Sequence, residues 1–351
     1  MKILVISLAG IGDTLFATPL LRELRANFPD ATIDVLVMWA GAKDLLEHNP
    51  NVSRVFQKNL IKSGKFEAIN FLRSLQKNNY DFSINTFPQS KIHYRIAAWL
   101  AGAKIRISHE YECFGVLDKF LVNQILPQDY SRHAVEQNLS TLQSLRAKQK
   151  FVAHELQIFL TLEEQNWANQ FLAQNNLTGK KWLGVHVGSG GTKNLSLRRW
   201  PLENYIELSR RLQAEKKLPT LFFGGPEEAV SHETIRSQFP SAIFPPTKNI
   251  REAAALAKFA TAFLTVDTAL MHIAATMKVP GQIVIETPSW NKPIEPFGNP
   301  FTLVKNPAVA GRNLEFYRYD GGDIKGSRKE IIASMKSVSV ESIFEVVAKL
   351  I

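Results

Sequence analysis

Short apolar runs alternate along the chain with segments whose apolar residues recur at helical spacing. The run KILVISL at residues 2–8 is almost wholly apolar, which is typical of a strand buried on both faces of a parallel sheet. Leucines at helical spacing follow over residues 14–27, with Pro19 near the start, and TIDVLV at residues 32–37 reads as the next strand. This strand–helix alternation predicts an α/β domain.

The alternation continues and begins again near residue 182, which predicts two Rossmann-like domains with parallel sheets facing across a cleft. We expect a first domain over residues 1–175, a second over 176–330, and a C-terminal helix within 331–351 that packs toward the first domain. Residues 110–132 are predicted to be irregular. The further predicted strands are 52–56, 82–85, 104–107, 182–187, 219–223, 243–244, 263–266 and 282–285. The further predicted helices are 43–48, 66–77, 92–101, 133–147, 163–175, 201–215, 227–238, 250–259 and 338–350.

The composition limits the classes of partner that this protein is expected to bind. Lys and Arg number 42 against 32 Asp and Glu, so the net charge of +10 attracts nucleic acid, an anionic membrane face or a phosphorylated substrate. The single Cys113 excludes an intramolecular disulfide and suits a reducing cytosol. No apolar run approaches the roughly 20 residues of a membrane span, and no helix-turn-helix, zinc or RNP pattern marks a nucleic-acid-binding module.

One stretch, LTVDTALMHIAAT at residues 264–276, places polar side chains where a strand turns directly into a helix. Asp267 and Thr268 stand at the turn, and His272 lies in the first turns of the helix. The N–H groups of a helix start favour an anion such as phosphate. Two interpretations remain open: a phosphate site, or a cap formed by Asp267 or Thr268 beside a packed His272.

A second candidate is GIGD at residues 10–13, at the end of the first strand. Leu15 occupies the place of the third glycine of a dinucleotide fingerprint, and no acidic residue ends the second strand, so the NAD interpretation fails. What remains is a turn that lets backbone approach a ligand beside the Asp13 carboxylate. The alternative is that Asp13 only caps the following helix.

Two further loops follow predicted strands. VGSGGTK at residues 187–193 forms a candidate anion nest, although it lacks the P-loop spacing, and Lys193, Arg198 and Arg199 lie near enough in sequence to neutralise a diphosphate. GGPEE at residues 224–228 offers Glu227 or Glu228 to ribose hydroxyls. The alternatives are an exposed loop with incidental charge and carboxylates favoured by a helix dipole. No cluster has metal-ligand spacing.

Together these stretches resemble the heptosyltransferases of glycosyltransferase family 9, which have the GT-B fold. The motifs that carry the resemblance occur in the family's order along nearly the whole chain. They are GDTLFATPLLREL (12–24), NPNV (49–52), YDF (80–82), LAGA (100–103), RH (132–133), HVGS (186–189), RWP (199–201), GGPE (224–227) and DTALMHIA (267–274). The resemblance implies an inverting, metal-independent transfer of heptose from ADP-heptose to a lipopolysaccharide core, without a cofactor.

The resemblance also implies roles for individual residues. Asp13 would be the general base for the acceptor hydroxyl. Backbone amides at 268–270, with Ser189 and one of two arginines, would hold the diphosphate, while a carboxylate would hold the ribose and Lys248 would flank the adenine. The implied donor-binding positions are Gly12, Ser189, Arg198, Arg199, Glu227, Lys248, Asp267, Thr268, Ala269, Leu270 and His272. The acceptor candidates are Lys91, Arg95, Arg106 and His109.

The expected partners are a nucleotide sugar, a lipid-linked glycan and, transiently, the anionic cytoplasmic face of the inner membrane, with no nucleic acid. We expect a cytoplasmic protein. The chain departs from the family where Ala269 replaces a common glycine and where VIETPSW occupies residues 284–290. Two alternatives are weighed against a transferase: a GT-B-like nucleotide-sugar epimerase and a basic nucleic-acid-binding protein.

Overall fold

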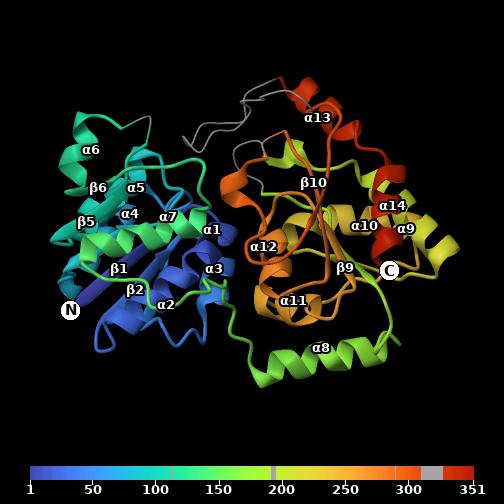
Figure 1. Cartoon of the computed structure of the whole chain (residues 1–351), viewed down its shortest axis with the longest axis horizontal. Helices are drawn as coiled ribbons and strands as arrows, with labels where there is room; N and C mark the ends of the chain where they lie inside the picture. Colours follow the sequence, from blue (N-terminus) through green and yellow to red (C-terminus); the bar gives the residue numbers. More distant parts are fainter. Residues whose placement is uncertain (112–113, 191–194, 289, 310–326) are drawn as a thin grey trace. The chain divides into compact units, whose positions relative to one another are not determined.

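The structure is a computed structural model that describes residues 1–111, 114–190, 195–288, 290–309 and 327–351 (Figure 1). The chain forms two compact units. The first comprises Met1–Phe159 together with Lys292–Phe297, and the second comprises Leu160–Asn291 and the described residues from Gly298 onward. Cys113 and residues 191–193 lie outside the described residues.

The first unit is built on a six-stranded parallel sheet with the order β3-β2-β1-β4-β5-β6. Residues 3–6 of β1 are fully buried, as expected for a central strand covered on both faces. The chain runs outward from β1 through β2 and β3 and then returns to β4 on the other side of β1, so the strand order reverses between β1 and β4. The strands are β1 Lys2–Ser7, β2 Thr32–Val37, β3 Arg54–Gln57, β4 Phe82–Asn85, β5 Ile105–His109 and β6 Gln124–Leu126.

The second unit repeats the plan with five parallel strands in the order β11-β10-β9-β7-β8. Here the order reverses between β7 and β9. Ligands of open α/β sheets bind at such reversals, beyond the carboxyl ends of the strands. The strands are β7 Leu183–His186, β8 Thr220–Phe223, β9 Ala262–Thr265, β10 Gly281–Ile285 and β11 Thr302–Val304.

Helices connect and cover the strands of both sheets (Figure 1). In the first unit they are α1 Ile11–Phe16, α2 Thr18–Asn27, α3 Ala40–Leu46, α4 Lys65–Ser74, α5 Ile92–Ala101, α6 Val116–Leu121 and α7 Ala134–Ser140. In the second they are α8 Leu162–Gln174, α9 Leu202–Lys216, α10 Ala229–Gln238, α11 Ile250–Ala257, α12 Ala269–Thr276, α13 Arg328–Lys336 and α14 Val340–Leu350.

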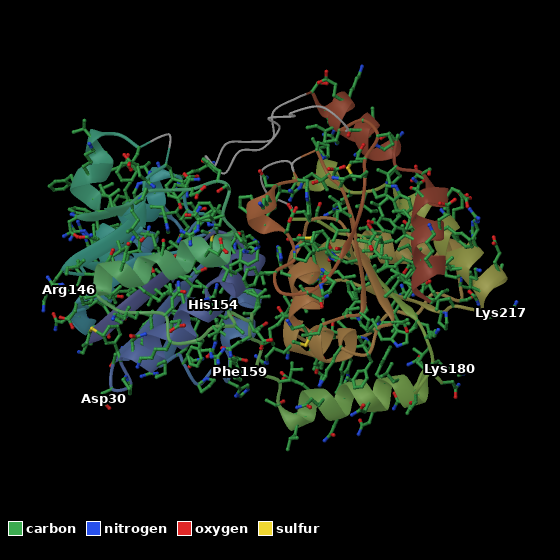
Figure 2. All side chains as sticks on the ribbon, in the orientation of Figure 1. Asp30, Arg146, His154, Phe159, Lys180 and Lys217 are labelled. Atoms are coloured by element: carbon green, nitrogen blue, oxygen red, sulfur yellow. The ribbon has the colours of Figure 1, made fainter. Side chains whose placement is uncertain are left out.

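Two helices depart from the predicted domain boundaries. The first unit's continuous part ends at Phe159 (labelled in Figure 2), before the predicted boundary at residue 175, so α8 belongs to the second unit. A buried ion pair explains this, because Arg251 Nε of α11 lies 2.6 Å from Glu164 Oε1 of α8. The C-terminal α14 packs on α9, β10 and β11 of its own unit; the packing toward the first domain that was expected stays a prediction. Its Ile343 and Val347 are fully buried in that core.

Other differences concern single elements. The helix predicted over residues 14–27 is two helices, α1 and α2, and Pro19 lies in the first turn of α2, where its missing N–H costs no intrahelical bond. The stretch predicted to be irregular, 110–132, contains α6 and β6, and β11 and α13 were not predicted. The predicted strand at 243–244 is reduced to a single bridge between Leu221 and Ile243.

No helix in the described part of the chain is long and apolar enough to cross a bilayer.

Candidate functional site

The strand reversal of the second sheet brings together the loops that follow β7 and β9. His186 ends β7, and its Nδ1 lies 3.2 Å from the hydroxyl of Thr268, the residue that precedes α12. Thr268 is the N-cap of α12, but its side chain makes no capping hydrogen bond, so the interpretation of Thr268 as a side-chain cap is wrong. The first turn of α12 therefore presents its backbone N–H groups and the positive end of the helix dipole beside the β7 loop.

The two adjacent arginines have different partners. Arg198 Nη1 lies 2.7 Å from Asp267 Oδ2, and both side chains are largely buried. Arg199 is only half-buried and donates to Ser189, from Nη2 to the backbone oxygen at 2.7 Å and from Nε to Oγ at 3.2 Å. The charge of Arg198 is matched by Asp267, whereas the charge of Arg199 acts on the pKa values of His186 and Glu228. Of these two arginines, Arg199 is therefore the candidate for contact with an anionic ligand. Sequence alone did not distinguish the two.

Glu228, rather than Glu227, lies within this loop cluster. Its Oε2 accepts from the Gly225 N–H at 2.8 Å, and its Oε1 lies 3.9 Å from His186 Nε2. A Cβ added at Gly188 would come within 2.1 Å of Glu228 Oε1, so this loop passes over the carboxylate only because residue 188 is glycine. Glu227 is exposed in the same turn.

Burial shifts the pKa of two titratable groups in this loop cluster. It raises the pKa of the Glu228 carboxyl and lowers the pKa of His186 to about 3, with the positive charge of Arg199 also lowering the latter. His186 is therefore neutral at physiological pH. It orients Thr268 without adding charge to the site.

The remaining predicted donor positions are not all at the strand reversal. Ala269 is half-buried at the start of α12, and Leu270 follows it with 8% of its surface exposed. His272 lies buried further along the same helix. Lys248 is exposed in the loop before α11, where its backbone N–H donates to Glu252 at 2.6 Å.

The reversal of the first sheet carries Asp13. Gly10 is the N-cap of α1, so Asp13 lies in the first turn and is not the cap. A Cβ at Gly10 would come within 2.8 Å of Asp13 Oδ2, which places the carboxylate over this glycine. Burial and the negative charge of Asp13 together raise the pKa of Tyr94 to about 12. Asp13 is half-buried, next to Gly12, and is accessible to solvent.

Side chains from the neighbouring strands hold the loop before Asp13. Gln89, which follows β4, accepts from the Leu8 N–H at 3.1 Å, and Trp39, which follows β2, donates to the Ala9 carbonyl at 2.8 Å. Neither residue was predicted as part of the site. The signal was present, because both follow strands whose carboxyl ends meet at the same edge of the sheet.

The acceptor candidates separate by burial. Arg95 is fully buried and forms an ion pair with Asp118, so its prediction as an acceptor-binding residue is corrected: it holds α5 to α6. His109 is also fully buried, bonded to a backbone carbonyl, and burial lowers its pKa to about 4. The Arg106 guanidinium donates to two backbone carbonyls. Lys91 is the N-cap of α5 and remains half-buried.

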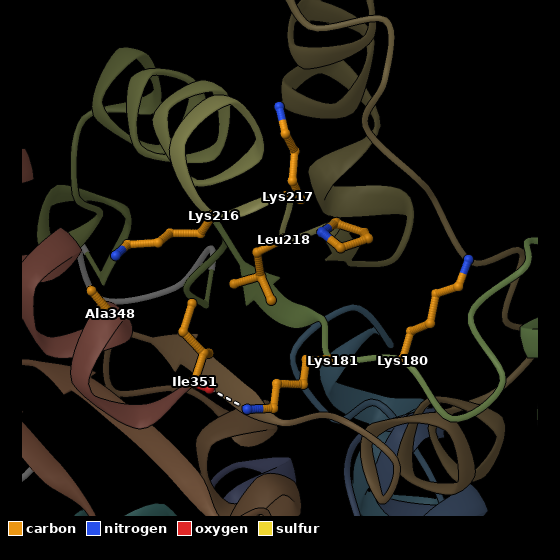
Figure 3. Close-up of a pocket in the computed structure, with 8 residues that line it drawn as sticks. Lys180, Lys181, Lys216, Lys217, Leu218, Ala348 and Ile351 are labelled. Atoms are coloured by element: carbon orange, nitrogen blue, oxygen red, sulfur yellow. Dashed lines mark hydrogen bonds between the residues drawn. The ribbon is translucent and has the colours of Figure 1, made fainter.

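A basic hollow lies elsewhere in the second unit, where β7 and β8 begin (Figure 3). It is lined by residues before both strands and at the end of α14. The Lys181 ammonium contacts the Ile351 backbone oxygen. Since ligands of such sheets bind at carboxyl ends, this hollow is not the donor site. Its lysines are Lys180, Lys181, Lys216 and Lys217.

Comparisons with known proteins agree with this fold. Residues 68–311 match the family described as glycosyltransferase family 9 (heptosyltransferase). The chain is 25% identical to lipooligosaccharide heptosyltransferase 2 of Haemophilus influenzae, over 99% of this chain and 100% of that protein. It is 30% identical to lipopolysaccharide heptosyltransferase 3 of Escherichia coli, over 38% of this chain and 39% of that protein. The structure of the E. coli ADP-heptose lps heptosyltransferase II superposes with a TM-score of 0.71 at 20% identity, covering 100% and 98% of the two chains, and confirms the predicted GT-B fold.

Proposed function

Because this chain belongs to glycosyltransferase family 9, the heptosyltransferase family, we propose that it transfers heptose from ADP-heptose to a lipopolysaccharide core or a related glycan. The chain is a glycosyltransferase, and its membership of the family supports the transferase over the epimerase and the nucleic-acid-binding alternatives. Its relatives are named as heptosyltransferases of lipopolysaccharide and lipooligosaccharide. We propose heptose transfer for this chain too, on the basis of the loops that follow β7 and β9 in the second unit.

One observation carries the donor assignment: Thr268, the N-cap of α12, makes no side-chain capping hydrogen bond and contacts His186 at the end of β7, and the loop after β7 holds the Arg199 guanidinium through Ser189. The amides of Ala269 and Leu270 would donate to the diphosphate, and Arg199 would balance its charge. Ser189 holds Arg199 in place through its backbone oxygen. Asp267 acts on the donor indirectly, because it orients Arg198 beneath the same loop.

The nucleoside would lie toward the β8 loop. Glu227 is exposed at the turn that follows β8, whereas Glu228 is turned inward to Gly225 and His186, so Glu227 is the carboxylate proposed to accept from the ribose hydroxyls. Lys248 stays the proposed neighbour of the adenine. His272, at the buried side of α12, would shape the sugar end of the pocket rather than contact the phosphates.

Asp13 is proposed to act as the general base. The acceptor hydroxyl oxygen attacks the anomeric carbon, the bond from that carbon to the diphosphate oxygen breaks, and its electron pair leaves with ADP. The hydroxyl proton passes to the Asp13 carboxylate. A single displacement of this kind inverts the anomeric configuration. The half-buried carboxylate supports this role, as do the hydrogen bonds of Gln89 and Trp39 that hold the preceding loop at Leu8 and Ala9. A base must be held within hydrogen-bond reach of the proton it takes.

We propose that the departing diphosphate is stabilised without a metal ion. Arg199 and the first-turn amides of α12 would supply the positive potential that a divalent cation provides elsewhere. Turnover should then be unchanged after treatment with EDTA and should gain nothing from added Mg²⁺. Lys91 is proposed as a contact to the acceptor, and a cytoplasmic location follows from the proposed nucleotide-sugar donor.

A donor screen tests the proposal. The purified chain is incubated with ADP- and UDP-sugars and a panel of truncated lipopolysaccharide cores, and products are identified by mass spectrometry. We expect a mass gain of one heptose with ADP-heptose, and ADP should raise the melting temperature because it binds the folded state. The proposal would fail if no sugar is transferred and only nucleic acid raises the melting temperature, with a steep dependence on salt.

A further inference from the structure

Helix α6 exposes its apolar side chains and buries its carboxylate, the reverse of an ordinary surface helix. Val116 is 88% exposed, Leu117 56% and Phe120 66%, whereas Asp118 is only 2% exposed. Lys119 is exposed among the apolar side chains. Contiguous exposed apolar residues, such as these three within six consecutive positions, are typical of an interaction surface.

The inverted orientation is fixed by the interior of the unit. Asp118 Oδ1 pairs with the Arg95 guanidinium, and its Oδ2 accepts from the Gly115 N–H at 2.7 Å. Turning α6 about its axis would leave the fully buried Arg95 cation without its carboxylate, and an unpaired buried charge is strongly unfavourable. The outward position of Val116 and Phe120 is therefore a built feature of the fold.

The apolar surface continues onto α5, which packs against α6 (Figure 1). The Trp99 ring lies 6.3 Å from the Phe120 ring and is 39% exposed. Ile92, two turns earlier on α5, is 37% exposed. We call these exposed residues the α5–α6 apolar face: Ile92, Trp99, Val116, Leu117 and Phe120.

We propose that the α5–α6 apolar face binds the surface of a bilayer that carries anionic headgroups. Aromatic and aliphatic side chains with an interspersed lysine are the composition of interfacial membrane contacts. The charge is complementary, because Lys119 and Lys91 adjoin the face while the carboxylate of α6 is turned inward and neutralised by Arg95. With no spanning helix among the described residues, such contact would be peripheral. The inference rests on the proposed function only in that a lipid-linked acceptor gives the contact a purpose.

Vesicle sedimentation tests the proposal with the full chain. Vesicles of phosphatidylcholine alone are compared with vesicles containing phosphatidylglycerol. Wild type should bind the anionic vesicles, and the variant V116S/L117S/F120S should bind about tenfold more weakly or worse. The matched control is L162S/V230S/F259S, which makes the same three changes at positions of the second unit that are 78%, 82% and 43% exposed. This control should bind like wild type.

The variant K119E isolates the contribution of charge. It changes the net charge by two units, and each unit should weaken binding to anionic vesicles by about fivefold. Binding to vesicles of phosphatidylcholine alone should be unchanged. Equal binding by wild type and V116S/L117S/F120S would overturn the proposal. It would also be overturned if wild type is dimeric by light scattering and that variant is monomeric, since a second copy would then cover the face. Transfer to a soluble truncated acceptor, measured in parallel, should be retained by all variants; its loss in wild type would count against the proposed function instead.

Discussion

The two strand reversals share one geometry and differ in chemistry. In each, a polar side chain joins the two loops that leave the sheet: Gln89 binds the Leu8 N–H in the first unit, and His186 contacts Thr268 in the second. The first reversal then presents the Asp13 carboxylate, whereas the second presents the start of α12 and, in the loop after β7, Arg199 bound to Ser189. One architecture is thus proposed to carry a proton acceptor in one unit and an anion-binding site in the other, because function depends on the loop residues rather than on the sheet.

The largest effect should come from removing the base. Asp13→Asn keeps the size of the side chain but cannot take a proton, so turnover should fall by about 10²–10⁴-fold with ADP affinity nearly unchanged. Steady-state transfer and calorimetric ADP binding check the two parts. The control is Asp30→Asn, the same change at an exposed loop residue (Figure 2), which should leave turnover unaltered. Wild-type turnover in Asp13→Asn would remove the base assignment.

Variants of the two adjacent arginines should separate an effect on folding stability from an effect on ADP binding. Arg198→Ala leaves the largely buried Asp267 without its partner and should lower the free energy of unfolding by about 3–5 kcal/mol. Arg199→Ala should fold normally and bind ADP more weakly. Denaturant unfolding and ADP titration measure both, with the exposed Arg210→Ala as a control for loss of one positive charge. If Arg199→Ala binds ADP like wild type, Arg199 is only a loop contact.

A glycine substitution tests the crowding at the β7 loop. Gly188→Ala should destabilise the chain by about 1–3 kcal/mol, because the new Cβ meets the Glu228 carboxylate. Gly64→Ala is the control for a Cβ without crowding, because a Cβ there meets nothing within 4 Å. It should change the free energy of unfolding by less than about 1 kcal/mol, since the entropy gain of Gly→Ala is opposed by the loss of a preferred residue at the N-cap of α4. The crowding interpretation predicts that Glu228→Ala added to Gly188→Ala recovers part of the loss; a fully additive double variant would contradict it.

The last prediction concerns stability in acid; no effect is expected at neutral pH. Burial lowers the pKa of His109 to about 4 and of His186 to about 3 from the usual 6.5. At a pH between the folded and the unfolded pKa of each histidine, the unfolded chain therefore binds more protons than the folded chain. The stabilisation is complete above pH 6.5 and is lost as pH falls toward 4. His109→Gln should flatten the pH dependence of unfolding by urea over this window, whereas His154→Gln, at a half-exposed residue, should not. The same slope in both variants would contradict this cause.

The buried strands could be predicted from sequence because their signal is local. The predicted strands at 32–37 and 82–85 have the observed bounds of β2 and β4. Helix α6 was missed because its orientation is set by Arg95 on another helix, which inverts the usual apolar pattern. For the same reason Arg95 and His109 were named as acceptor-binding candidates although both are fully buried, since sequence shows a polar side chain and not its buried partner. The site loops were found by their motifs, but the division between Arg198 and Arg199 required their contacts.

Amide hydrogen exchange with and without ADP tests the central claim most directly. If the start of α12 holds the diphosphate, ADP should slow exchange of the Ala269 and Leu270 amides and of the loop that follows β7, and leave the amides of residues 8–13 unchanged. Protection confined to residues 8–13, or none at α12 at saturating ADP, would contradict the division of roles between the two strand reversals.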